Sequence, residues 1–336
     1  MESAAAEIVF DRVTKRYPGR EEAAVADLSM TIPAGDICIL VGPSGAGKTT
    51  AMKMVNRLID YDEGDIRIDG RSIRDYDVTE LRRGIGYVIQ QVGLFPHMSV
   101  ADNVATVPRL LGWPRARQRE RTAELLDLVG LEPEYANRYP SQLSGGQRQR
   151  VGLARALAAD PPLMLMDEPF GALDPITRDR LQIELLRLHA EVRKTIIFVT
   201  HDIDEAIKLG DRIAIMREGG HLAQYDTPDR LLAHPADDFV QGFIGEGAAL
   251  KRLHFERVDS LELGEPDAQP THDTVDVSST LHAALDLMVG KGLSAVTVNR
   301  DGRPVGTSFS ARRPSGGSEA STHFCRWWPC DVRWTC

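Results

Sequence analysis

No apolar run in this 336-residue sequence reaches the roughly 18 residues that a membrane-spanning helix needs. The N-terminus, MESAAAEIVFDR, also lacks the basic and apolar segments of a secretory signal peptide. Basic residues are in the minority, with 40 Lys and Arg against 49 Asp and Glu, and the net charge of −9 argues against nucleic acid as the main partner. These absences predict a cytoplasmic protein that would serve a membrane only through a partner.

Cysteine is scarce and unevenly placed. Cys38 stands alone in the apolar run DICILVG, and the other three cysteines fall within the last twelve residues, beside three of the four tryptophans. The segment 308–336 shows no periodicity, and it could be a disordered tail or a frame-shifted C-terminus. A third interpretation is a metal site formed by His323, Cys325, Cys330 and Cys336. Their spacing, however, lacks a C-x-x-C clamp.

The organisation of the chain is that of a globular α/β protein. Hydrophobic residues make up 42% and charged residues 26%, and the length allows one large domain and a smaller one. Through residue 245, apolar strand patterns alternate with helical patterns, which predicts a mostly parallel α/β core. Between residues 90 and 143 helical signals are denser, so we expect a helical subdomain there, with its Arg and Glu run on a solvated face.

A glycine-rich loop follows the first buried strand. DICILVGPSGAGKTTAMKMVNRL predicts a strand over 37–41, then a loop, then a helix, and the loop fits the pattern G-x-x-x-x-G-K-[ST]. Its glycines let backbone N–H groups turn inward around a β-phosphate, and the helix adds its positive end. Lys48 would reach the β- and γ-phosphates, and the Thr49 hydroxyl would hold Mg²⁺.

Two further strands end in polar residues that suit phosphate chemistry. PLMLMDEP ends in Asp167, which can position Mg²⁺ through its water shell, and in Glu168, which can polarise an attacking water. TIIFVTHD ends in His201, at the edge where ligands bind in open α/β sheets. The residues alone leave His201 open between a structural role and stabilisation of the γ-phosphate.

A second glycine turn, LSGGQRQR at 143–150, raises the question of why one domain has two phosphate-binding turns. A Ser hydroxyl, two Gly N–H groups and a helix starting near Gly146 would make a second anion site. The RQR segment is better explained as helix face and packing than as a nucleic-acid patch.

Six motifs in order resemble the ATP-binding-cassette (ABC) ATPases over roughly residues 8–245. The resemblance implies a P-loop NTPase core with a mostly parallel sheet, an antiparallel β part and a helical subdomain. GPSGAGKTT resembles Walker A, LMLMDEP resembles Walker B, and LSGGQ resembles the signature. Residue 201 matches the switch histidine. The remaining two matches are Tyr17 for adenine stacking and Gln90 (with Gln91 as a second candidate) for the glutamine loop. Walker B is followed by the D-loop residues Ala172, Leu173 and Asp174.

The resemblance implies ATP and Mg²⁺ as the bound groups. Catalytic roles are implied for Glu168, His201, Lys48 and Gln90. Mg²⁺ is implied at Thr49, Gln90 and, indirectly, Asp167. The residues implied to contact nucleotide are Tyr17, Gly42, Pro43, Ser44, Gly45, Ala46, Gly47, Lys48, Thr49, Thr50, Ser144, Gly145, Gly146, Gln147 and Asp174.

The resemblance also implies partners. Two copies would form a head-to-tail homodimer sharing two ATP, with each 144–147 turn closing on the γ-phosphate held by the other copy. The segment VIQQVGLFPHMSVADNVATVPRLLGW is similar to the ATPases of uptake systems for glycine betaine, choline, carnitine and proline betaine. Such a subunit would lie at the cytoplasmic face of the inner membrane, bound to a permease and served indirectly by a solute-binding protein. The permease would dock in a groove beside the helical subdomain and the glutamine loop, with Phe95, Pro96 and His97 at its edge.

Other functions fit less well. An ABC importer for another small solute shares most of these motifs and stays open. Long coiled-coil insertions or two cassettes in one chain would indicate a non-transport ABC ATPase, and this sequence shows neither. Fused membrane spans would indicate an exporter, and the sequence shows none. A mainly regulatory module is disfavoured because the ATP site is complete.

The C-terminal part changes in character. Residues 246–275 lose periodicity and gain Pro, Asp and Gly, so we expect a linker. Residues 276–307 predict a helix, with Leu281, Leu285 and Met288 on one face, and then a strand–turn–strand with its turn at RDGR. This segment resembles the first half of a CBS motif, an α+β regulatory module that works in pairs.

Overall fold

The computed structural model describes residues 5–89, 93–171, 173–261, 263, 273–293 and 295–308. The chain divides into two compact units, Met1–Ala248 and Ala249–Cys336, and each is described here by itself. The first unit contains all the motifs that resemble an ABC ATPase.

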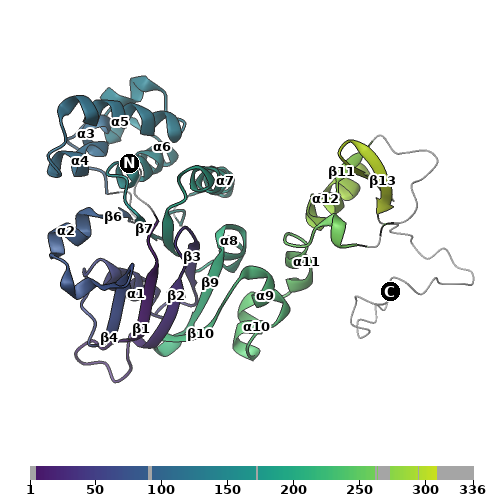
Figure 1. The fold of residues 1–336 in the computed structure, drawn as a ribbon, viewed down its shortest axis with the longest axis horizontal. Helices are drawn as coiled ribbons and strands as arrows, with labels where there is room; N and C mark the ends of the chain where they lie inside the picture. Colours follow the sequence, from purple (N-terminus) through teal and green to yellow (C-terminus); the bar gives the residue numbers. More distant parts are fainter. Residues whose placement is uncertain are drawn as a thin grey trace, which may run out of the picture. The chain divides into compact units, whose positions relative to one another are not determined.

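A six-stranded sheet forms the centre of the first unit (Figure 1). Its order is β10-β9-β3-β8-β7-β6, and every neighbouring pair is parallel except β10 with β9. The strands are β3 (Ile37–Val41), β6 (Ile85–Val88), β7 (Leu163–Asp167), β8 (Thr195–Val199), β9 (Arg212–Arg217) and β10 (His221–Asp226). Every residue of β3, β7 and β8 is buried, as expected of strands covered on both faces. Because these three strands are adjacent and parallel, their carboxyl ends meet at one edge of the sheet.

A second, antiparallel sheet lies in the same unit, in the order β2-β1-β4-β5. Its strands are β1 (Ile8–Lys15), β2 (Val25–Ile32), β4 (Glu63–Ile68) and β5 (Arg71–Ser72). One hydrophobic core joins Phe10 and Leu28 of this sheet to Leu40 and Val199 of the six-stranded sheet, with Met52 of α1 among them. Helix α1 is therefore packed in the core that the two sheets share.

Helices cover the six-stranded sheet through a second core. That core joins Val104 and Leu125 of the helical subdomain to Val151, Leu181 and Phe198. The expected helical subdomain consists of α3 (Val100–Val104), α4 (Thr106–Leu110) and α5 (Arg115–Leu128). The other helices are α1 (Lys48–Val55), α2 (Val78–Arg83), α6 (Gly145–Leu157), α7 (Pro175–Val192), α8 (Ile203–Leu209), α9 (Pro228–Ala233) and α10 (Asp238–Ile244). Short 3₁₀ turns are η1 (Ile73–Asp75), η2 (Pro133–Asn137), η3 (Pro140–Gln142) and η4 (Glu218–Gly220).

This arrangement confirms the α/β fold expected from the sequence, with its parallel sheet, antiparallel part and helical subdomain. Among the described residues, no helix combines the length and the apolar character needed to cross a membrane.

The second unit has its own small core. Strands β11 (Thr274–Asp276), β12 (Val296–Arg300) and β13 (Arg303–Ser308) form a sheet in which β11 is parallel and β13 antiparallel to β12. Helix α12 (Leu281–Lys291) and the β12–β13 hairpin match the predicted helix and strand–turn–strand. Val258, Leu281, Met288, Val296 and Val298 are buried together.

The segment expected as a linker, 246–275, differs from that expectation where it is described. It contains α11 (Ala248–Arg252), η5 (Val258–Ser260) and the start of β11. These elements are too short to produce a periodic signal, yet Val258 is fully buried in the core of the second unit. The tail expected over 308–336 lies outside the described part of the chain from residue 309 onward. Its three interpretations therefore stay predictions.

Candidate active site at the carboxyl ends of the central strands

The glycines of the 42–47 loop lie in different surroundings. A Cβ added to Gly42 would lie 2.1 Å from the carbonyl oxygen of Met216, and one added to Gly47 would lie 2.0 Å from that of Ala24. Both positions therefore need glycine for backbone packing. Gly45, at φ +83°, is different, because a Cβ there would meet nothing within 4 Å. It borders open space, which leaves room for a phosphate to approach the loop closely.

Lys48 is the first residue of α1 and lies beneath this loop. Its side chain is buried, and Nζ donates hydrogen bonds to the carbonyl oxygens of Gly42 at 2.7 Å and Pro43 at 2.8 Å. Burial lowers the pKa of Lys48, while the charges of Glu168 and Asp167 act to raise it. The ammonium group is thus held inside the loop, with two carboxylates close enough to influence it.

Thr49 of α1 and Asp167 at the end of β7 are in contact. The Thr49 hydroxyl, on α1, donates to Oδ1 of Asp167 at 2.9 Å, although 118 residues separate them in sequence. A hydroxyl and a carboxylate oxygen at this distance are the hard oxygen donors that Mg²⁺ prefers, so the residues fit that ion.

Lys53 is a neighbour of this pair that sequence reasoning missed. Its Nζ lies 3.6 Å from Oδ2 of Asp167. Thr49 and Lys53 are spaced i, i+4 on α1, so a helical projection from the loop could have indicated that both share one face.

Glu168 and His201 leave adjacent strands at this same edge. Nδ1 of His201 lies 3.4 Å from Oε1 of Glu168, and the Glu168 backbone N–H donates to the carbonyl of Val199 at 3.0 Å. Glu168 has a φ of 42°, a left-handed conformation that costs a non-glycine residue about 1–2 kcal/mol. Strain of this kind is concentrated at functional sites. The His201 side chain is 64% exposed, so it can meet a ligand from outside.

The second glycine turn is a helix start. Ser144 is the N-cap of α6, which begins at Gly145, one residue earlier than expected. Its hydroxyl accepts from the Gln147 N–H at 3.3 Å, and the Gln147 side-chain oxygen accepts from the Ser144 N–H at 2.9 Å, which completes a capping box. Within the described residues, the hydrogen bonds of this turn do not reach the 42–49 loop of the same chain. Gly146 instead lies against the D-loop helix, where an added Cβ would be 3.2 Å from Cγ2 of Thr177.

The RQR segment packs as expected. Arg148 donates to the carbonyl of Leu143 at 2.9 Å, and Arg150 donates to that of Gly130 at 2.9 Å. Gln149 is buried. The side chains of the RQR segment therefore bond or pack within the protein itself.

The remaining candidates lie at the margins of the site. Asp174 is the N-cap of α7 and accepts from the Thr177 N–H at 3.0 Å, a bond that lowers the pKa of its carboxyl. Tyr17 is half-buried, with Nζ of Lys15 at 5.7 Å from its ring centroid. Gln90 lies outside the described residues.

Parallel strands that end in a phosphate-type loop, an Asp–Glu pair and a histidine define a P-loop nucleotide-binding protein. The family model described as "ABC transporter" matches residues 25–171. Together with the relatives below, this shows that the chain belongs to the ABC transporter family, as the sequence motifs predict.

Two curated relatives are similar over most of their length. The choline transport ATP-binding protein OpuBA of Bacillus subtilis (strain 168) is 50% identical over 298 residues, which cover 88% of this chain and 76% of the relative. The osmoprotectant import ATP-binding protein OsmV of Salmonella typhimurium is 46% identical over 323 residues, which cover 94% and 83%. A solved dimer of the ATP-binding cassette MJ0796, in a post-hydrolysis state with ADP and phosphate, matches 66% of this chain and 98% of its own, with 36% identity and a TM-score of 0.58.

Proposed function

We propose that this chain is the ATP-hydrolysing subunit of an importer for quaternary amines such as glycine betaine, choline or carnitine. The observation that carries the hydrolytic role is the convergence of Lys48, Asp167, Glu168 and His201 at one sheet edge, with the 2.9 Å contact of Thr49 to Asp167 beside them. The solute class is supported by the similarity to proteins of choline transport and osmoprotectant import.

The proposed reaction is in-line attack of water on the γ-phosphate, which gives ADP and phosphate. Glu168 accepts the proton of the attacking water, and Lys48 and His201 stabilise the charge on the transferring group. Thr49 and Gln90, with Asp167 acting indirectly, would hold Mg²⁺, which supplies charge neutralisation at the phosphate oxygens. Tyr17 would stack on the adenine.

The complete site is proposed to need two copies of the chain. The 144–147 turn makes its hydrogen bonds away from the chain's own 42–49 loop, so it is available to a second copy. In a head-to-tail homodimer, Ser144, Gly145, Gly146 and Gln147 would face the γ-phosphate held by the partner, with Asp174 near the same interface. The dimeric state of the similar MJ0796 cassette supports this arrangement.

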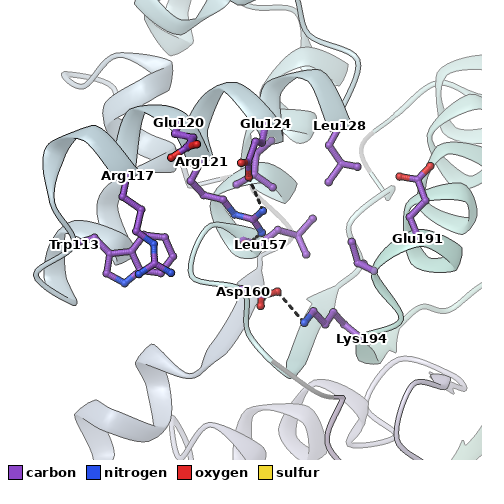
Figure 2. A pocket seen from close by; sticks show the side chains of 12 residues that line it. Trp113, Arg117, Glu120, Arg121, Glu124, Leu128, Leu157, Asp160, Glu191 and Lys194 are labelled. Carbon is purple, nitrogen blue, oxygen red and sulfur yellow. Dashed lines mark hydrogen bonds and ion pairs between the residues drawn. The ribbon is translucent and has the colours of Figure 1, made fainter. Parts of the chain in front are cut away.

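A groove beside the helical subdomain is the proposed docking site for a permease (Figure 2). It has a volume of about 520 Å³ and lies between α5 and the end of α7. On one wall the Arg117 guanidinium lies 3.6 Å from the ring centroid of Trp113. On the opposite wall Nζ of Lys194 pairs with Asp160 at 2.8 Å. Phe95, Pro96 and His97, expected at the edge of a docking groove, are not among the residues that line this one.

The remaining assignments complete the proposed system. The permease would place the subunit peripherally at the cytoplasmic face of the inner membrane, and a solute-binding protein would deliver the solute. The helix and hairpin of the second unit support the proposal that residues 276–307 are the first half of a CBS-like module.

Uptake measurements test the solute class. A deletion strain should lose uptake of labelled glycine betaine, choline or carnitine, and the native gene should restore it while a Glu168→Gln variant should not. Normal uptake of all three in the deletion strain would reject the proposed solute class and leave the ATPase assignment to be judged by hydrolysis of the purified subunit.

A further inference from the structure

Glu205 is a buried acid that the proposed reaction does not use. It lies in the first turn of α8, is 7% exposed, and accepts a hydrogen bond at 2.8 Å from the side-chain amide of Gln182, which is 5% exposed. Burial raises the pKa of Glu205, and the Thr200 and Gln182 side chains act to lower it. A buried carboxyl is costly unless it is well bonded, so its partners indicate what it holds in place.

On one side, Glu205 is bonded to the strand end that carries the histidine. The Glu205 backbone N–H donates to Oδ1 of Asp202 at 3.2 Å, and the Asp202 N–H donates to the Thr200 hydroxyl at 3.1 Å. The Thr200 hydroxyl faces the Glu205 carboxyl and acts to lower its pKa. Thr200 and Asp202 are the two neighbours of His201 in the chain. The residues on both sides of His201 are therefore linked to Glu205, Asp202 by a hydrogen bond to the Glu205 N–H and Thr200 by its hydroxyl, which faces the Glu205 carboxyl.

On the other side, Glu205 is bonded to the helix that carries the D-loop. Gln182 belongs to α7, whose N-cap is Asp174. Arg178, between them, donates to the carbonyl of Leu173 at 3.1 Å, which fixes the D-loop onto the first turns of the helix. At 1.5 Å per residue, Gln182 lies about 12 Å along the helix from Asp174. A rigid helix thus connects the D-loop to the Gln182–Glu205 bond, and α7 and α8 are neighbours in the fold (Figure 1).

We propose that Glu205 is a positioning residue that holds the His201 strand end and the D-loop helix in a fixed relation to each other. It touches no substrate, and it acts through the orientation of His201 relative to Glu168. This inference rests on the proposed ATPase function. It predicts that loss of the Gln182–Glu205–Thr200 connection lowers turnover more than it lowers ATP binding, because the 42–49 loop takes no part in it.

Four variants separate positioning from simple stability. Glu205→Leu removes the carboxyl that accepts from Gln182 and faces Thr200, at similar volume, and Gln182→Met removes only the donor on α7. Glu205→Gln keeps an acceptor for Gln182 and places an amide N–H against the Thr200 hydroxyl, which can accept from it, so it is the conservative rescue. His189→Leu is the matched control, since His189 is a buried polar residue on the same helix whose Nε2 lies 2.9 Å from the carbonyl oxygen of Lys194.

The measurements are ATP hydrolysis as separate kcat and KM, nucleotide-binding stoichiometry, and denaturant unfolding of the full-length protein. For Glu205→Leu we expect kcat to fall about tenfold or more, with KM within about twofold and full binding stoichiometry. Gln182→Met should show a smaller kcat loss of the same kind, and Glu205→Gln should stay within about threefold of the native protein. His189→Leu should lose stability but keep the native kcat per bound nucleotide.

Several outcomes would overturn the inference. One is a Glu205→Leu protein with near-native kcat, and another is an equal kcat loss in Glu205→Leu and His189→Leu. If Glu205→Leu does not fold, Gln182→Met decides the matter, and a native kcat in that variant rejects the proposal. A native protein that binds ATP but does not hydrolyse it would instead reject the proposed function, so the two failures are distinguishable.

Discussion

His201 Nδ1 lies 3.4 Å from Glu168 Oε1; Glu168 directly follows β7, and His201 is the second residue after the neighbouring parallel strand β8. The Glu168 N–H also bonds to the last carbonyl of the histidine strand, that of Val199, at 3.0 Å. Glu168 and His201 are therefore held by the sheet itself, and Glu168 leaves its strand in a left-handed conformation.

Replacing Glu168 tests the base assignment. Glu168→Gln keeps the size and a hydrogen-bonding oxygen but cannot accept the proton of the attacking water. We expect kcat to fall by about 10²-fold or more, with ATP binding retained and a closed dimer accumulating in ATP. Steady-state hydrolysis and light scattering with ATP would measure both effects. Glu63→Gln, which removes an exposed carboxylate of the antiparallel sheet, should behave as the native protein. Near-normal hydrolysis by Glu168→Gln would remove Glu168 from the mechanism.

The loop glycines provide a matched pair of variants. Gly47→Ala forces a Cβ to 2.0 Å from a backbone oxygen at φ +87°, so we expect it to lower the free energy of unfolding by about 3 kcal/mol. Gly45→Ala meets only open space at φ +83°, so about 1–2 kcal/mol of backbone strain is expected, together with a large loss of nucleotide affinity from crowding of the phosphate. Urea unfolding and nucleotide titration would measure the two quantities. Unimpaired nucleotide binding by Gly45→Ala would place the phosphate elsewhere.

Much of the site could be predicted from the sequence because it follows strands whose every residue is buried. Continuous apolar runs identify β3, β7 and β8, and in a parallel sheet their ends must meet. The contribution of Glu205 could not be predicted in this way. It depends on a hydrogen bond between two helices that are distant in sequence. In the sequence, a single Glu in the first turn of a helix is explained equally well by its favourable interaction with the helix dipole.

The second unit shows a similar limit. Helix α12 has a clear apolar stripe, whereas η5 is three residues long and contributes Val258 to the core through contacts distant in sequence. A short element of this kind has no periodicity of its own, so composition alone indicated a linker.

The proposed permease groove predicts a separation of hydrolysis from transport. Trp113→Ala removes the ring on which Arg117 stacks, while the residues of the 42–49 loop stay unchanged. We expect the isolated subunit to hydrolyse ATP at the native rate and solute uptake in cells to fall several-fold, because an aromatic anchor in a docking surface typically contributes 1 kcal/mol or more. Leu58→Ala, at an exposed apolar side chain that does not line the groove, is the control. Full uptake with Trp113→Ala would argue that the permease docks elsewhere.

The assignment of the 144–147 turn to the partner's site can be tested by a variant and by mixing. Ser144→Arg removes the cap of α6, which costs about 1 kcal/mol, and places a long cation where a second copy would approach. We expect the monomer to bind ATP normally, while the closed dimer and its turnover are lost. Ser144→Ala loses the same cap without the added bulk and should still dimerise. Mixing Ser144→Arg with Lys48→Ala should restore part of the hydrolysis, because one of the two shared sites then combines a native loop with a native turn. Hydrolysis that survives in Ser144→Arg alone would show that the turn does not complete a site in the partner.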